Sequence, residues 1–205
     1  MKLYWFATPN ARKACAVARY LDAPVEFVHV DLTKRAQRDP AFLAINPNGK
    51  VPALSDGDFH LWESAAIMCY LAERAGSSLW PQEAKQRAEV LSWISWDLAH
   101  FSRHGGVLFF EHLIRPVFQL GDPDAGAVEE ATGFFRQFAA VLDKHLEERE
   151  WLVADTLSIA DFAVAALLPY ASAAHLPVEE FPEVLRWHAQ LEALPAWQAP
   201  FPVTG

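Results

Sequence analysis

Two segments of the sequence place polar residues at the expected start of a helix. Thr8-Pro9-Asn10 and Glu63-Ser64 each precede apolar residues at helical spacing. A helix N-terminus presents unpaired N–H groups and a partial positive charge. Ser64 could therefore hold a carboxylate there, and Glu63 could meet an ammonium group. The ordinary alternative for both segments is a helix cap that binds no ligand.

Three further residues are unusual for their expected positions. Arg12 and Lys13 fall near the start of the first of these helices, where cations oppose the helix dipole unless an anion binds nearby. Pro52 lies inside Val51-Pro52-Ala53-Leu54, which otherwise predicts a strand. Because proline cannot donate to a sheet ladder, the residues alone favour the first position of an edge strand.

A long predicted helix carries His100 and His104, four residues apart. Two histidines at this spacing could share a metal ion, but no third ligand is obvious and Arg103 would repel a cation. We therefore predict no metal. Trp96, His100, Arg103, His104 and Val107 follow helical spacing and are expected to share one face.

The composition limits the possible functions. The chain has 205 residues, of which 52% are hydrophobic, enough for one large domain or two small ones. A net charge of −9 disfavours binding to nucleic acid, and no apolar run approaches the ~20 residues of a membrane helix. Residues 1–76 carry nine basic and eight acidic side chains, whereas residues 77–205 carry eight and eighteen. An anionic ligand is thus expected mainly on the first part.

The expected elements form two groups. Strands at 2–7 and 25–30 with a helix between them predict a parallel βαβ unit. A short helix, a strand from Val51, an Asp56-Gly57 hairpin and a helix from Glu63 follow, which gives the order β-α-β-α-β-β-α of a thioredoxin-like domain over residues 1–76. Residues 77–82 are a predicted linker. An all-helical domain over 83–205 is predicted from helices at 83–115, 124–149, 158–175 and 182–194.

This arrangement and three motifs resemble the cytosolic glutathione transferases over the whole chain. "NPNGKVPAL" (46–54) is similar to the family's Asn-Pro-x-Gly-x-Val-Pro-x-Leu segment, and "ES" (63–64) to its glutathione-binding Glu-Ser pair. "SIADF" (158–162) is similar to the Ser/Thr-x-x-Asp cap of its helical domain. We interpret Ser158 and Asp161 as a capping box, which serves folding and not chemistry.

The resemblance implies that the Val51–Pro52 peptide bond is cis and that the backbone of Val51 pairs with glutathione as an added strand would. It also implies that Glu63 meets the γ-glutamyl ammonium group and that Ser64 holds the γ-glutamyl carboxylate.

The family's chemistry is ionisation of the glutathione thiol, whose free pKa is about 8.5. Its members place a Tyr, Ser or Cys near the end of the first strand or the start of the first helix. Here Tyr4 lies in mid-strand and is interpreted as a core residue, and Cys15 lies about two turns into the helix and is interpreted as buried. Thr8 and Asn10 are therefore the predicted catalytic residues, because Thr-Pro-Asn resembles the bacterial nu-type members.

Two loop residues complete the predicted glutathione site. By position, Gln37 resembles a residue that reaches the glycyl end, and Lys50 could meet the glycine carboxylate. For each, the alternative is a solvated loop residue. A small hydrophobic electrophile is expected in a second-substrate pocket lined by His100, Arg103, His104 and Val107, although these residues could instead cover a dimer interface.

The resemblance thus implies a cytoplasmic, homodimeric detoxification enzyme that uses glutathione as a substrate. Two cysteines without a Cys-x-x-Cys pair suit a reducing cytosol. Two alternatives stay open: a glutathione-dependent reductase of disulfides or peroxides, and a non-catalytic binding protein with the same fold.

Overall fold

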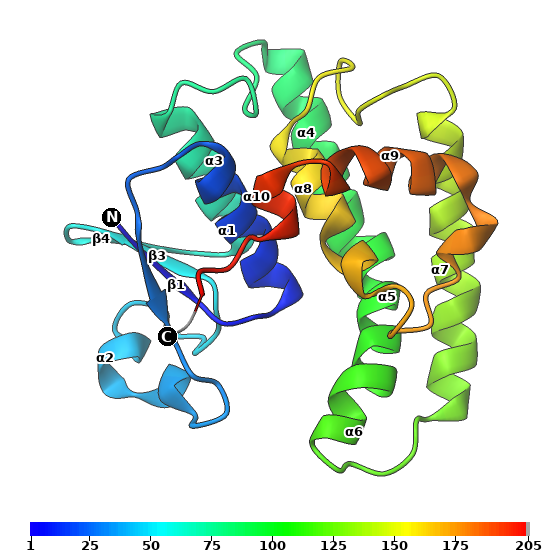
Figure 1. Cartoon of the computed structure of the whole chain (residues 1–205), viewed down its shortest axis with the longest axis horizontal. Helices are drawn as coiled ribbons and strands as arrows, with labels where there is room; N and C mark the ends of the chain where they lie inside the picture. Colours follow the sequence, from blue (N-terminus) through cyan, green and yellow to red (C-terminus); the bar gives the residue numbers. More distant parts are fainter. Residues whose placement is uncertain (204–205) are drawn as a thin grey trace. The chain divides into compact units, whose positions relative to one another are not determined.

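The computed structural model describes residues 1–203, and the chain divides into two compact units (Figure 1). Residues 1–80 and 192–203 form the first unit, and residues 81–191 form the second. The division after Trp80 falls inside the predicted linker. The sequence assigned residues 192–203 to the helical domain, but the structure groups them with the first unit, because the buried ring of Trp197 packs with Arg12 there.

The first unit has the predicted order of strands and helices, with one C-terminal helix added. Its elements are β1 (Lys2–Trp5), α1 (Pro9–Tyr20), β2 (Glu26–His29), a 3₁₀ turn (Ala36–Arg38), α2 (Pro40–Leu43), β3 (Ala53–Asp56), β4 (Phe59–Trp62), α3 (Ser64–Arg74) and α10 (Pro195–Gln198). As predicted, Thr8 caps α1 and Pro9 is its first residue.

The topology of the sheet decides where the functional segments meet. The strand order is β2-β1-β3-β4, with β1 parallel to β2, β3 antiparallel to β1 and β4 antiparallel to β3. Strands β1 and β4 therefore run in the same direction and end at the edge where β3 begins. As a result, α1 and α3 start at this edge of the sheet, and the segment before β3 ends there.

The core of this unit covers both faces of the sheet. Successive residues of a strand point to opposite faces. Leu3 is fully buried, and the ring of Tyr4 lies 5.8 Å from Phe42 of α2. Cys15 of α1 is fully buried, and this burial raises the pKa of its thiol to about 12. The structure thus confirms that Cys15 is buried and places Tyr4 against the core.

The helical unit contains two departures from the predicted helices. Its elements are α4 (Ala84–Trp96), a π-helical turn (Asp97–Phe101), α5 (Ser102–Phe109), a second π-helical turn (Phe110–Ile114), α6 (Arg115–Val117), α7 (Ala125–Leu146), α8 (Ile159–Val164), 3₁₀ segments (Ala165–Tyr170 and Val178–Glu180) and α9 (Pro182–Glu192). The long helix predicted at 83–115 is continuous, but the two π turns interrupt its α-helical pattern. The helix predicted over 158–175 is wrong beyond Val164, where a 3₁₀ segment containing Pro169 begins, since proline cannot donate a helical hydrogen bond.

None of the helices within residues 1–203 combines the length and apolar character needed to cross a bilayer.

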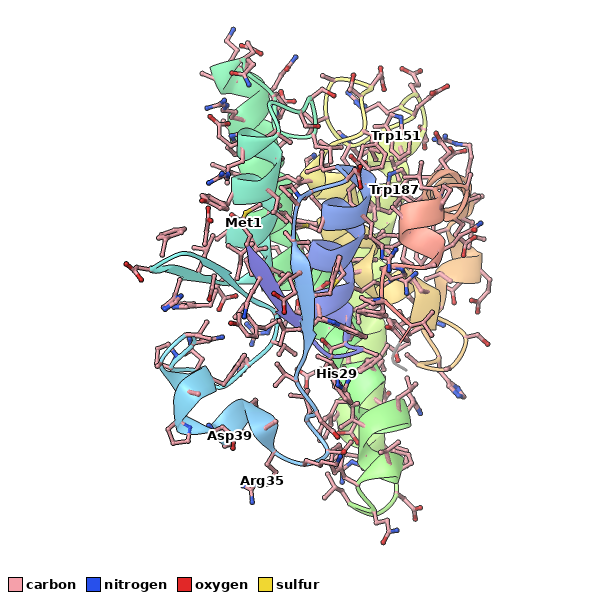
Figure 2. All side chains as sticks on the ribbon, turned by 60° about the vertical axis from the view of Figure 1, so that its left-hand side comes forward. Met1, His29, Arg35, Asp39, Trp151 and Trp187 are labelled. Carbon is pink, nitrogen blue, oxygen red and sulfur yellow. The ribbon has the colours of Figure 1, made fainter. Side chains whose placement is uncertain are left out.

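The predicted capping box is confirmed at the start of α8. Ser158 and Asp161 cap each other, and the Asp161 carboxylate is completely buried. It also accepts hydrogen bonds from the backbone N–H of Leu152 and from the indole N–H of Trp187, both at 3.0 Å. Trp187, which is labelled in Figure 2, belongs to α9. Burial raises the pKa of Asp161, and these donors oppose that shift. The carboxylate therefore joins α8, α9 and the segment before α8.

We predict that Asp161→Asn lowers the free energy of unfolding by about 3 kcal/mol, because an amide nitrogen would face buried N–H donors. Asp143→Asn is the matched control, since Asp143 accepts from the N–H groups of Glu183 and Val184 in a partly buried setting. Asp143→Asn is expected to lower the free energy of unfolding by about 1 kcal/mol. Urea denaturation of both variants measures the difference, and equal losses would contradict this account of the helical core.

Candidate active site

A pocket of about 120 Å³ lies in the first unit, where α1, β3 and α3 begin. It is lined by Asn10, Asn46, Asn48, Lys50, Val51, Pro52, Glu63 and Ser64. Six of these residues were predicted as site residues from the sequence. Asn46 and Asn48 were not, although both belong to the "NPNGKVPAL" segment.

The backbone of Val51 is presented to this pocket. The Val51–Pro52 peptide bond is cis, as the resemblance implied. The side chain of Val51 packs against the core cluster of Val30, Phe42 and Ala53. Strand β3 begins only at Ala53, and within residues 1–203 the backbone N–H and C=O of Val51 have no hydrogen-bond partner. These two groups are thus free to pair with an extended peptide.

A buried asparagine fixes the loop that leads to Val51. Asn46 is 2% exposed, and its side-chain N–H donates to the Lys50 carbonyl oxygen at 2.7 Å. Its side-chain oxygen accepts from the backbone N–H of Asn48 at 3.0 Å. Gly49 has φ +59°, and a Cβ there would lie 3.0 Å from the Gln37 carbonyl oxygen, so glycine is needed for both reasons.

The start of α3 carries strain and open hydrogen-bonding capacity. Glu63 has φ 70° and ψ 121°, a conformation that costs a non-glycine residue about 1–3 kcal/mol. Ser64 is buried, and no side chain caps the helix. Within residues 1–203 the Ser64 hydroxyl has no hydrogen-bond partner, so the helix N-terminus retains free donors facing the pocket. Strain of this kind concentrates at functional sites.

The two predicted catalytic residues lie at the start of α1 but face different surroundings. The Thr8 hydroxyl oxygen accepts from the backbone N–H of Ala11 at 3.3 Å, and Thr8 is not among the residues that line the pocket. Its O–H has no acceptor within residues 1–203. Asn10 is exposed and lines the pocket. Thr8 can therefore cap the helix with a lone pair and still donate its hydrogen to a ligand.

Gln37 lies beside the pocket and not in its lining. It belongs to the 3₁₀ turn before α2, and its side-chain oxygen is buried without a partner within residues 1–203. Its backbone carbonyl is close to Gly49, which ties this turn to the pocket loop.

The residues predicted for a second-substrate pocket are partly engaged within the helical unit. His100 belongs to the first π-helical turn, and its ring stacks on Phe138 of α7 at 4.7 Å. The ring of His104 stacks on Phe134 at 4.6 Å, and burial, with the charge of Arg103, lowers the pKa of His104. Arg103 is exposed and Val107 is half-buried.

Two other hollows of the described chain have linings that are less suited to a peptide ligand. They lie in the helical unit, with volumes of about 410 and 520 Å³, and neither is lined by a predicted site residue. The first is bordered mostly by acidic side chains. Over residues 1–203, no three His, Cys, Asp or Glu side chains come together in a group that could hold a metal ion.

Comparison with known proteins agrees with this arrangement. Residues 1–73 match the family described as glutathione S-transferase, N-terminal domain, and residues 106–195 match glutathione S-transferase, C-terminal domain. Glutathione S-transferase 3 of Zea mays is 36% identical over 206 residues, which covers 97% of this chain and 91% of that protein. The disulfide-bond oxidoreductase YfcG of Escherichia coli strain K12 is 31% identical over 201 residues, covering 95% and 91%.

A solved structure is similar over the whole chain. The glutathione transferase from Pseudomonas putida, crystallised with one glutathione disulfide bound per subunit, superimposes with a TM-score of 0.89 and 26% sequence identity, covering all of this chain and 91% of that one. Both halves of the sequence, the fold and the relatives agree, and the chain therefore belongs to the glutathione S-transferase family.

Proposed function

We propose that this glutathione transferase binds glutathione in the pocket around Val51 and Ser64 and ionises its thiol at the start of α1, for attack on an electrophile. One observation carries the proposal. The unpaired backbone of Val51, the open N-terminus of α3 and the Asn10 side chain line the same pocket.

The groups of the pocket complement a peptide that carries charge at both ends. The Ser64 hydroxyl and the N–H groups of α3 suit the γ-glutamyl carboxylate, and Glu63 suits the neighbouring ammonium group. Val51 pairs with the backbone of the cysteinyl residue, and Lys50 meets the glycine carboxylate. Gln37 supports this end from beside the loop.

Groups in the first turn of α1 then stabilise the ionised thiol. Each unit by which the thiol pKa is lowered requires about 1.4 kcal/mol of preferential stabilisation of the thiolate. The Thr8 O–H, the Asn10 amide and the positive end of the helix dipole can each supply part of it. The thiolate attacks an electrophilic carbon, a C–S bond forms and the leaving group departs with the electron pair.

Substitutions at Thr8 and Asn10 test this assignment. Thr8→Val keeps the shape but removes both the O–H donor and the oxygen that caps α1. We expect its kcat/KM with an aryl halide to fall at least tenfold, and Asn10→Ala is expected to cost a similar factor. Thr8→Ser keeps both the cap and the donor and is the matched control, with activity within about threefold of wild type. Steady-state kinetics at fixed pH make the comparison.

Unchanged activity in both Thr8→Val and Asn10→Ala would show that neither residue is catalytic, while the protein would still be an active transferase. Tight glutathione binding by the wild type without any turnover would instead favour the non-catalytic binding protein.

Disulfide reduction is a second candidate function. It is supported by the likeness to YfcG, which is named a disulfide-bond oxidoreductase, and to a transferase crystallised with glutathione disulfide. The same thiolate would attack one sulfur of a disulfide, form a mixed disulfide and release the other sulfur as a thiolate. A second glutathione would then resolve the mixed disulfide. Turnover of a small disulfide, assayed beside the aryl halide, shows which reaction is faster.

For the second substrate we propose an apolar electrophile bound beside Arg103 and Val107. The rings of His100 and His104 would contribute stacked aromatic surfaces to this pocket, held by Phe138 and Phe134 of α7.

The backbone of Glu63 allows binding and stability to be separated. Glu63→Gly and Glu63→Ala both remove the carboxylate, and each should weaken glutathione binding about tenfold in calorimetry. Only glycine accepts φ 70° without strain. The free energy of unfolding should therefore be about 1 kcal/mol larger for Glu63→Gly than for Glu63→Ala, so that the glycine variant is the more stable of the two. Wild-type affinity in both variants would exclude Glu63 from the binding site.

We also propose a cytoplasmic homodimer with a role in detoxification. Leu91 and Leu98, seven residues apart on one continuous helix, are 49% and 53% exposed, and this apolar face supports a contact between two copies. Analytical ultracentrifugation at micromolar concentration should give twice the mass of the chain, and a single-chain mass would contradict the dimer.

A further inference from the structure

The C-terminal segment, residues 192–203, contacts the N-terminal part of the first unit on both sides of the turn that carries Thr8 and Asn10. This turn, Ala7–Asn10, follows β1 and includes the first two residues of α1. Before the turn, Trp5 stacks on Phe201, with the ring centroids 5.1 Å apart and the planes at 13°. After it, Arg12 contacts Trp197. The contacts join residues more than 180 positions apart in sequence.

Arg12 connects this segment directly to Thr8. Its guanidinium lies 4.9 Å from the centre of the Trp197 ring and donates a hydrogen bond to the Trp197 carbonyl oxygen. Its backbone N–H donates to the Thr8 carbonyl oxygen at 2.8 Å, as the first i→i−4 hydrogen bond of α1. The side chain that contacts Trp197 therefore belongs to the residue that closes the first turn on Thr8. Trp197 is 1% exposed, so the platform under the guanidinium is rigidly packed. Arg12 therefore has an intramolecular reason for its place near the start of α1.

A second arginine of α1 is hydrogen-bonded to the same C-terminal segment, farther along the helix. The Arg19 side chain donates to the Pro200 carbonyl oxygen at 2.9 Å. Arg19 lies seven residues after Arg12, or about 10 Å along the helix and away from the turn.

We propose that the C-terminal segment is a clamp that positions the Ala7–Asn10 turn for thiol ionisation, with Arg12 as the main positioning residue. Hydrogen bonds to a thiolate depend steeply on distance and angle. A displacement of about 1 Å at a catalytic group can cost a large factor in rate. Trp197 and Phe201 hold the two ends of the turn, while Arg12 links the Thr8 carbonyl to the clamp. Arg12 touches neither the thiol nor the electrophile in this scheme.

This inference rests on the proposed role of Thr8 and Asn10, and the pKa of the bound glutathione thiol tests it. Arg12→Lys keeps the charge but loses the planar stacking and the forked donor. We expect the thiol pKa, measured by ultraviolet absorbance of the thiolate against pH, to rise by about one unit, with kcat at neutral pH down by up to about tenfold as the thiolate fraction falls. The KM for glutathione should change less than threefold, because the pocket around Val51 is intact. Phe201→Ala, at a partly exposed residue, should shift the pKa in the same direction.

Arg19→Lys is the matched control and should leave the thiol pKa unchanged and kcat within about twofold of wild type. Equal shifts of the thiol pKa in Arg12→Lys and Arg19→Lys would mean that losing either contact loosens the C-terminal segment as a whole. That result would overturn the clamp. No shift in Arg12→Lys would overturn it as well, and would leave the glutathione site itself standing. A wild-type enzyme that shows no thiolate at all would overturn the proposed thiol activation and the clamp together.

Discussion

The hydrogen bond from the buried side chain of Asn46 to the Lys50 carbonyl is the constraint on which the site depends. It fixes the loop just before Val51, at the point where the chain must approach β3 without yet joining the sheet. The Val51 side chain is held by the core, so its backbone N–H and C=O face the pocket unpaired. These two groups could pair in a strand, but the loop leaves them available to a ligand.

Much of this arrangement could be predicted from local sequence. Thr8-Pro9 marks the start of α1, Ser158 with Asp161 marks the start of α8, and both caps act within four residues. The parallel pair of β1 and β2 and the β3–β4 hairpin follow from local sequence. The antiparallel pairing of β3 with β1, across residues 30–52, was not predicted. Once the three pairings are known, the ends of β1 and β4 must lie at the edge where β3 begins. Asn10, Val51 and Ser64 therefore meet, although no local pattern joins them.

The features that escaped prediction depend on distant contacts or on backbone detail. Trp197 lies 185 residues from Arg12, and no periodicity relates them. The left-handed φ of Glu63 is imposed by the junction of β4 and α3 and not by the residue's own preference. His100 and His104 have the spacing of pocket-lining residues, but their stacking on α7 depends on how that helix packs. The role of Asn46 had a sequence signal in the Asn-Pro-x-Gly segment, but its hydrogen bond to the Lys50 carbonyl could be identified only in three dimensions.

A crystal structure of the protein with glutathione bound tests the central claim most directly. We expect the cysteinyl backbone to pair with the N–H and C=O of Val51 and the γ-glutamyl carboxylate to lie on Ser64. The sulfur should lie within hydrogen-bonding distance of the Thr8 hydroxyl or the Asn10 amide. Glutathione bound elsewhere, or with its sulfur directed away from the first turn of α1, would contradict the proposed site.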